Sequence, residues 1–195
     1  MPEVRTVGKP LLPKFFSVNQ FRLEWNHFTQ TETQPRAGGT PVHAVISMNC
    51  ELDFVESGNL LIYQDTQKKW RLGKITVRCV MIKNQSKVWA VQLRKNSTQQ
   101  NSELLKHERV HVELAERHAR FVFQQLQQIA VSGSDLSVIS KQLIDSAFRL
   151  RNDHWKKLEL MNTRYDTQTL HSTNSGAQQR WNSKYLSTTN SNAIL

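Results

Sequence analysis

The sequence predicts an α+β fold in which a small antiparallel sheet packs beside two long antiparallel helices. In the first half of the chain, apolar and polar residues alternate, which is typical of strands that bury one face. In the second half, apolar residues recur every three to four positions, which is typical of amphipathic helices. With 195 residues, 38% of them hydrophobic, the chain is long enough to bury a core without disulfides or metals.

Three strands are expected between residues 42 and 93. Residues 42–54 alternate almost without fault between an apolar and a polar face. A second alternating run covers Ile75–Met81, and a third covers Trp89–Leu93 after a turn at Lys83–Lys87. Short strands joined by turns favour an antiparallel sheet.

The two cysteines, Cys50 and Cys79, lie on the apolar faces of their expected strands. If these strands are neighbours, a disulfide between the two is geometrically allowed and would favour an oxidising compartment. The alternative is that both are small buried side chains. Their spacing excludes a Cys-x-x-Cys metal site.

Two long helices are expected after the strands. The first runs from about Ser102 to Ala130 and ends at the breaker Ser132-Gly133-Ser134. The second runs from Asp135 to about Leu160. The polar tail that follows includes a short helix through Gln178, Trp181 and Leu186.

The chain is expected to form one domain with short flanking segments. This organisation places an N-terminal extension at residues 1–18, a single domain at 19–187 and a disordered tail at 188–195. The N-terminal residues lack the apolar segment of a signal peptide. We therefore expect either a protein that is not exported by that route or one whose signal is absent from this chain.

The chain is basic, with 26 Lys and Arg against 16 Asp and Glu and a formal net charge of +10. This charge favours an anionic partner, such as an envelope surface. The basic residues are spread along the chain, without a block of five or more and without a nucleic-acid motif, which argues against nucleic-acid binding. No run approaches the roughly 18 apolar residues of a membrane-spanning helix.

The most specific signal is His107-Glu108-Arg109-Val110-His111, which lies early in the first expected helix. Its two histidines are four residues apart on one helix face, separated by about 6 Å of rise, so both imidazoles can reach one zinc ion. Glu108 is one residue round from the pair, where its carboxylate can act as a general base on a zinc-bound water. This spacing is the short signature of a zinc peptidase. The alternative interpretation is an ordinary charged helix face.

A catalytic zinc needs a third protein ligand and an open position. His118 lies about 10.5 Å further along the same helix, which is out of reach of a metal held by the first pair. Glu116 is rotated away and is a candidate for a supporting contact or a buried salt bridge. The spacing of the metzincin motif also fails. Spacing alone leaves four downstream candidates open, namely His154, Glu159, Asp166 and His171.

Three blocks of the chain resemble a bacterial family of predicted secreted zinc-dependent proteases, catalogued as a domain of unknown function. The resemblance covers most of residues 20–186. The blocks are Arg22-Leu23-Glu24-Trp25-Asn26-His27-Phe28, Leu104–His111 with Glu116 and Arg120, and Tyr165–His171 with Gln178 and Trp181.

The resemblance implies a zincin-like protease that is secreted or periplasmic and acts on a peptide or protein. It also implies that His107, His111 and His171 bind Zn²⁺, that Glu108 is the general base and that Tyr165 donates a hydrogen bond to the developing oxyanion. The alternative for Tyr165 is a packing tyrosine. The chain departs from the family at Ser172, where the resemblance implies glycine, a residue that would permit a tight backbone approach to the metal in the His171 loop.

The sequence therefore favours a zinc-dependent metallopeptidase in which Glu108 activates a zinc-bound water. Two alternatives from other classes remain. One is a non-catalytic basic binding module, whose binding would depend steeply on salt. The other is a zinc amidase that acts on cell-wall peptides.

Overall fold

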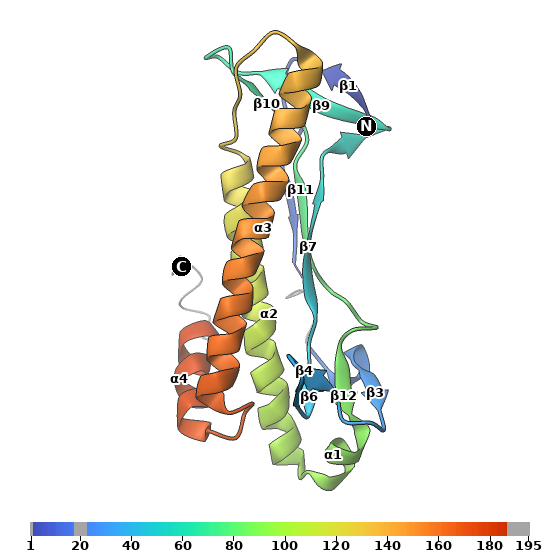
Figure 1. Ribbon diagram of the computed structural model, residues 1–195, viewed down its shortest axis with the longest axis vertical. Coiled ribbons are helices and arrows are strands. Elements are labelled where there is room, and N and C mark those ends of the chain that lie inside the picture. The colour runs from blue at the N-terminus through green and yellow to red at the C-terminus, as the bar shows by residue number, and fades with distance from the viewer. Residues whose placement is uncertain (1, 18–22, 187–195) are drawn as a thin grey trace. The chain divides into compact units, whose positions relative to one another are not determined.

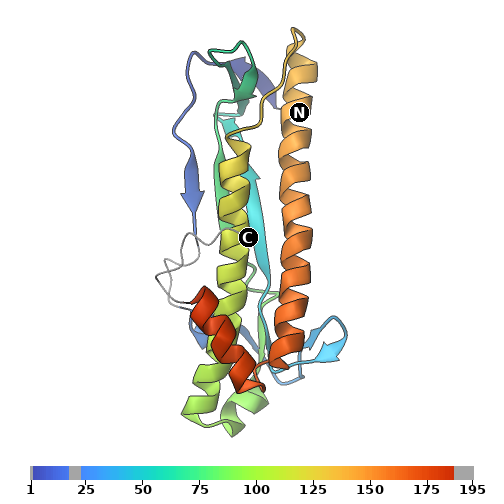
Figure 2. The same cartoon turned by 90° about the vertical axis from the view of Figure 1, so that its left-hand side faces the viewer.

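In the part of the chain that the structure describes, four α-helices and several small mixed sheets make up an α+β fold, which is seen in a computed structural model (Figures 1 and 2). The structure describes residues 2–17 and 23–186. These residues form two compact units, each assembled from three parts of the chain. Unit 1 takes the described residues within 1–16, 50–78 and 118–156, and unit 2 takes those within 17–49, 79–117 and 157–195.

Unit 1 contains a four-stranded sheet built around β9 (Asn59–Gln64). Strand β1 (Glu3–Thr6) pairs with β9 in parallel, and β10 (Trp70–Leu72) and β8 (Val55–Glu56) pair with it antiparallel. Leu60 and Ile62 of β9 are almost completely buried. The expected N-terminal extension therefore contributes a strand to this sheet.

A second sheet has the strand order β2-β11-β7. In unit 1, β2 (Lys14–Phe16) runs parallel to β11 (Thr76–Met81), with Val77 opposite Phe15. Strands β11 and β7 (Met48–Asp53) both continue from one unit into the other. The mixed pairing corrects the expectation of one antiparallel sheet, because β1, β2 and a third strand described below each pair in parallel with a strand far along the chain.

Unit 2 contains a three-stranded sheet of order β3-β12-β6. The central strand β12 (Lys87–Trp89) is parallel to β3 (Thr29–Thr31) and antiparallel to β6 (Ala44–Val45). Strand β6 is an edge strand of this sheet. A hairpin of β4 (Arg36–Ala37) and β5 (Thr40–Pro41) precedes it.

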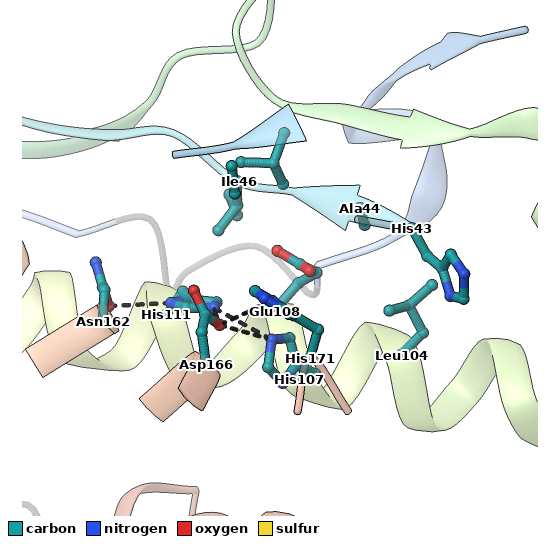
Figure 3. A pocket seen from close by; sticks show the side chains of 12 residues that line it. His43, Ala44, Ile46, Leu104, His107, Glu108, His111, Asn162, Asp166 and His171 are labelled. Atoms are coloured by element: carbon teal, nitrogen blue, oxygen red, sulfur yellow. Dashed lines mark hydrogen bonds and ion pairs between the residues drawn. The ribbon is translucent and has the colours of Figure 1, made fainter. Parts of the chain in front are cut away.

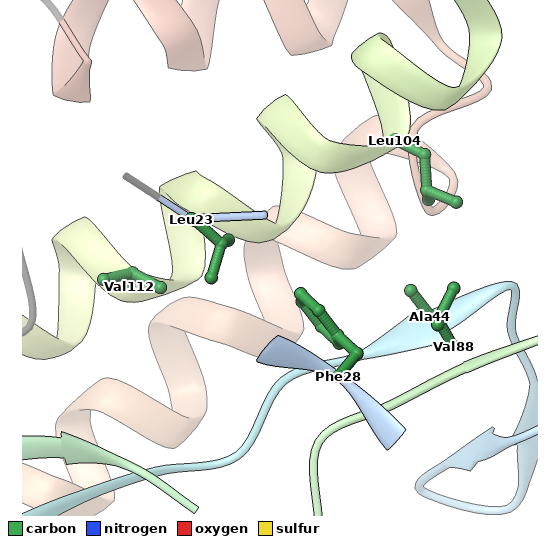
Figure 4. Packing of buried hydrophobic residues seen from close by; sticks show 6 residues of the cluster. All are labelled: Leu23, Phe28, Ala44, Val88, Leu104 and Val112. Carbon is green, nitrogen blue, oxygen red and sulfur yellow. The ribbon is translucent and has the colours of Figure 1, made fainter. Parts of the chain in front are cut away.

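A small apolar cluster holds this sheet against the first half of α2 (Thr98–Leu126). Phe28 and Ala44 on the strand side face Leu104 and Val112 on the helix (Figure 4). Burial of the Leu, Val and Phe side chains of the cluster contributes roughly 1.5–3 kcal/mol each. The cluster thereby fixes the first turns of α2 next to β6. Its six buried members are Leu23, Phe28, Ala44, Val88, Leu104 and Val112.

The two long helices exist, with different limits from those expected. Helix α2 begins earlier, because Ser97 and Gln100 form a reciprocal capping pair at 3.2 and 2.8 Å. Helix α3 (Leu136–Thr169) begins where the Asp135 carboxylate accepts from the Ser137 and Val138 amides. Contacts of His107 with Asp166 and of His111 with Asn162 show that the two helices are antiparallel in unit 2.

Helix α3 continues well past the expected end at about Leu160, so Tyr165 and Asp166 are helical and do not lie in a loop. The helix ends at Thr169 and is followed by three consecutive residues with left-handed backbone, Leu170, His171 and Ser172. The short helix expected in the tail is present as α4 (Ser175–Tyr185), which is capped by the Asn174 side chain on the Ala177 amide.

Two strand predictions need correction. The expected strand at 42–54 is interrupted between β6 and β7, where the buried Ser86 hydroxyl accepts from the Ser47 amide in place of a strand partner. The expected strand at Trp89–Leu93 ends at Trp89, and residues Ala90–Lys95 form helix α1. A short run of apolar residues fits both the two-residue period of a strand and the 3.6-residue period of a helix. Here the run forms helix α1, which precedes α2.

The two cysteines are both buried and reduced in the structure. Burial raises the pKa of the Cys50 thiol to about 12. Within the described ranges, no helix carries an apolar stretch long enough to cross a bilayer. The tail expected at 188–195 and Arg22 of the first resembling block lie outside the described residues.

Candidate metal centre

Helix α2 carries the two histidines of the motif on one face, as their spacing predicts. The rings of His107 and His111 are 5.0 Å apart at an interplanar angle of 80°, and their Nε2 atoms lie 3.3 Å from each other. Both side chains are almost fully buried.

Asp166 on helix α3 meets this pair. Its Oδ1 atom lies 3.1 Å from Nε2 of His107 and 3.0 Å from Nε2 of His111. The three side chains point toward one another from the two antiparallel helices (Figure 3). Asp166 was one of the four candidates for a third ligand, and it is the one whose oxygen converges with both histidines.

The other nitrogen of each histidine faces an amide oxygen. Nδ1 of His107 lies 2.9 Å from Oε1 of Gln178, and Nδ1 of His111 lies 3.0 Å from Oδ1 of Asn162. An amide oxygen only accepts, so each Nδ1 must carry the proton. In the neutral rings each Nε2 is then an unprotonated acceptor aimed at the others.

A hydrogen-bond network fixes the orientation of the Gln178 amide. Its Nε2 donates to Oδ1 of Asn182 at 2.7 Å and to the Tyr165 hydroxyl at 2.6 Å. The Tyr165 hydroxyl in turn lies 3.2 Å from the carbonyl oxygen of His107 and 2.9 Å from Oε1 of Gln178. The amide therefore turns its oxygen, and not its nitrogen, toward His107.

Nε2 of His107, Nε2 of His111 and Oδ1 of Asp166 therefore surround one point, at a distance from it that is close to a metal–ligand bond length. Zn–N and Zn–O bonds of about 2.0–2.1 Å in a tetrahedron put neighbouring donor atoms about 3.3–3.4 Å apart. The observed separations of 3.0, 3.1 and 3.3 Å are close to these edges. A His₂-carboxylate set suits zinc or a related transition metal, so the residues present fit such an ion.

Without an ion, protons must hold the three atoms together. Burial of Asp166 by itself would raise its pKa, but hydrogen bonds from His107 and His111 hold the pKa well below the usual range. Burial likewise would lower the pKa of His111, but the hydrogen bond and charge of Asp166 outweigh it and raise that pKa to about 9. The site therefore attracts positive charge strongly.

Glu108 is almost completely buried beside the three converging atoms. Burial raises the pKa of its carboxyl group, against the opposing charges of His107 and His111. Among the described residues, its Oε2 atom has no hydrogen-bond partner. A buried carboxylate oxygen without a partner is costly, so a group that the chain does not supply is expected to meet it.

A cavity of about 100 Å³ opens over these groups and has room for several waters. In Figure 3 the Glu108 carboxylate lies between the histidine pair and Ile46, which follows edge strand β6. His43 lies beside Leu104 at one end, and burial and the nearby His171 lower its pKa. The lining residues are Ala37, His43, Ala44, Val45, Ile46, Leu104, His107, Glu108, His111, Asn162, Asp166 and His171.

His171, the ligand that the resemblance implies, lies beside the converging group and outside it. Its Nδ1 atom is 3.7 Å from Oδ1 of Asp166, and its side chain remains 37% exposed. Its backbone is left-handed, as is that of Ser172, the position at which the family is expected to have glycine. His171 therefore lines the cavity next to the third donor.

Tyr165 is fully buried and does not line the cavity. Its ring stacks on His107 at 4.5 Å and 19°, and its hydroxyl is committed to Gln178 and the His107 carbonyl. Burial raises its pKa. The oxyanion role expected for Tyr165 finds no geometric support, and its contacts fit support of His107.

The remaining candidates lie elsewhere. Glu159 is exposed on helix α3. His154 belongs to unit 1, where its ring stacks on Phe121 at 4.3 Å and lies 5.9 Å from that of His118. Glu116 is buried.

Sequence reasoning missed the roles of Asn162 and Gln178 as acceptors for the two histidines, although Gln178 belongs to one of the resembling blocks. If the second helix is continued beyond Leu160, positions 162 and 166 lie one turn apart on one face, which would have placed Asn162 beside Asp166. His43 falls on the polar face of the strand expected at 42–54, and alternation alone does not indicate that it lines a cavity.

Comparison of the chain with protein-family models, with curated proteins and with solved structures found no match in any of the three.

Proposed function

We propose that this protein is a zinc-dependent metallopeptidase with a zincin-like site. One observation carries the proposal: Nε2 of His107, Nε2 of His111 and Oδ1 of Asp166 converge at 3.0–3.3 Å while both Nδ1 atoms are committed as donors. With both rings neutral these are three acceptors, which repel one another unless a proton or a metal cation lies between them. His107, His111 and Asp166 would hold the ion.

Three protein ligands distinguish a catalytic zinc site from a structural one, which usually has four. The cavity over the three donors leaves access for a water and a peptide carbonyl. A zinc ion bound by these residues would supply a Lewis acid that lowers the pKa of a bound water toward neutrality. The carboxylate of Glu108 takes the proton of the attacking water and passes it to the leaving amine.

The raised pKa of Glu108 fits this role, because a carboxylate whose pKa is raised takes up a proton more readily. Gln178 and Asn162 hold the two histidines in the tautomer that presents Nε2 to the metal. Tyr165 supports the Gln178 amide and packs against His107.

Edge strand β6 supplies the place for the substrate backbone. The His43 carbonyl accepts from the Trp89 amide of β12. Because bonding alternates along an antiparallel pair, the amide and carbonyl of Ala44 point away from β12, toward the open edge. Ala44, Val45 and Ile46 also line the metal cavity, so an extended peptide added to β6 would pass over Glu108.

The substrate is therefore a peptide or protein segment in extended conformation. The secreted or periplasmic location expected from the family resemblance is part of the same proposal, as is the family itself.

The test is hydrolysis of a mixed peptide library by the zinc-loaded protein and by Glu108→Gln. The wild type should cleave, and Glu108→Gln should lose more than about 100-fold of the rate while it keeps its zinc. Glu103→Gln is the matched control, because Glu103 lies on the same helix, is bonded to Lys106 and does not line the cavity. Full activity in Glu108→Gln would refute the mechanism.

A further inference from the structure

A second, larger cavity lies next to the metal cavity and shares two lining residues with it, Val45 and Ile46. Its volume is about 780 Å³, enough for one or more substrate side chains. Apart from those two residues and Pro35, its lining is polar. The lining residues are Thr31, Glu32, Thr33, Gln34, Pro35, Arg36, Val45, Ile46, Ser47, Asn84, Gln85 and Lys87.

The charges in this second cavity do not cancel. Glu32 is the acidic residue of the lining, and both of its oxygens are bound by Arg94 at 3.1 and 2.7 Å. Arg94 itself lies outside the lining. Lys87 and Arg36 remain as the cations of the cavity lining. Nη1 of Arg36 donates a hydrogen bond to the Gly39 carbonyl. A guanidinium and an ammonium with donors to spare favour an anionic group.

The pairing of β6 with β12 tells which face of the sheet this cavity occupies. Val88 stands opposite Ala44, and both are buried in the apolar cluster against α2. Lys87 stands opposite Val45, one residue along, so these two side chains lie on the other face. The metal cavity and the second cavity are therefore reached from the two faces of the same edge strand.

A peptide added to the edge of β6 would present its side chains alternately to these two faces. Every second side chain would point toward the metal cavity, and the side chains between them would point toward Lys87. The side chain next to the one over Glu108 is thus the first to reach the second cavity.

We propose that this second cavity is a specificity subsite that binds a carboxylate side chain of the substrate, with Lys87 as its principal cation. The proposal rests on the proposed peptidase function for the placement of the peptide. It makes the protein selective for extended segments that carry Glu or Asp beside the scissile bond.

The experiment measures binding separately from hydrolysis. Fluorescence anisotropy is recorded for two labelled peptide pools, identical except that one has Glu and the other Lys at alternate positions, with the zinc-loaded Glu108→Gln protein at fixed ionic strength. Lys87→Glu is then added to that background, and Lys83→Glu serves as the control, because it changes the net charge equally and Lys83 is exposed and outside the lining. The same peptides are also given to the protein with Glu108 intact.

The Glu pool should bind about tenfold or more tightly than the Lys pool, as loss of a charge-assisted hydrogen bond implies. Lys87→Glu should abolish or reverse this preference, and Lys83→Glu should preserve it. Equal binding of both pools, or equal effects of the two variants, would overturn the subsite. Hydrolysis without such a preference would refute the subsite alone, whereas a preference in binding without hydrolysis of any peptide would refute the peptidase.

Discussion

Nδ1 of His107 lies 2.9 Å from Oε1 of Gln178, a residue 71 positions further along the chain. This contact matters for the chemistry of the site, because it commits Nδ1 as a donor, so that Nε2 of the neutral ring is the atom free to bind a cation beside Asp166. Asn162 does the same for His111. The candidate metal centre is thus a product of tertiary packing around a local motif.

Asp166 is expected to be the third ligand, and His171 is not. Asp166→Ala should weaken zinc binding by more than about 100-fold, since loss of a ligand exceeds the 10–100-fold effect of losing a ligand's hydrogen-bond partner. His171→Ala should weaken it less than about tenfold, because its Nδ1 is 3.7 Å from the carboxylate and outside the converging group. Competition with a chromophoric chelator measures both. The opposite ranking would restore His171 as the ligand that the resemblance implies.

Gln178 is expected to act through His107. Gln178→Leu removes the acceptor of the Nδ1 proton and leaves the Tyr165 hydroxyl without its amide partner, so zinc affinity should fall about 10–100-fold. Gln178→Glu should restore most of the affinity, because a carboxylate also accepts from Nδ1. Gln179→Leu on the exposed face of α4 is the control. If Gln178→Leu lowers only the free energy of unfolding and leaves zinc affinity intact, its role is structural alone.

The sequence was sufficient to predict what depends on neighbouring residues. His107, Glu108 and His111 share a helix, and their arrangement follows from helix geometry. Asp166 could not be selected from four candidates, since its choice depends on how far α3 extends and on packing between distant segments. The same reason explains the mixed sheets, where β1, β2 and β3 pair in parallel with later strands that local alternation does not identify.

Cys50 is expected to be unreactive and to make stability depend on alkaline pH. Its folded-state pKa of about 12 lies above the ordinary value of 9.0, so the unfolded chain releases this proton first. Stability from this group is therefore full below pH 9 and is lost as the pH rises from 9 toward 12, by at most about 1.4 kcal/mol per pH unit.

Urea unfolding at several pH values between 8 and 10.5 tests this. The free energy of unfolding of the wild type should fall more steeply above pH 9 than that of Cys50→Ala. Parallel slopes would contradict the burial of the thiol. An aromatic disulfide reagent at pH 8 should label neither cysteine in the native protein and both in urea, because both are buried and reduced.

Ser172 is expected to be a strained position that glycine relieves. Its φ of 78° lies in the left-handed region, directly after Leu170 and His171 with φ of 48° and 49°. A residue with a Cβ is destabilised by roughly 1–2 kcal/mol in the left-handed conformation. Glycine avoids this strain, but its greater conformational freedom in the unfolded chain offsets part of the stabilisation. Ser172→Gly should therefore raise the free energy of unfolding by about 0.5–1 kcal/mol.

Thr173→Gly is the matched control, because Thr173 is exposed in the same turn and its φ is not positive. It should destabilise the protein, since its hydroxyl donates to the Leu170 carbonyl at 2.7 Å. Chemical unfolding of both variants measures the difference. A stabilised Ser172→Gly with unchanged zinc affinity would show that the turn can relax without moving Asp166, which lies six residues earlier in the last turn of α3. A destabilised Ser172→Gly would mean that the serine conformation is set by contacts stronger than the backbone strain.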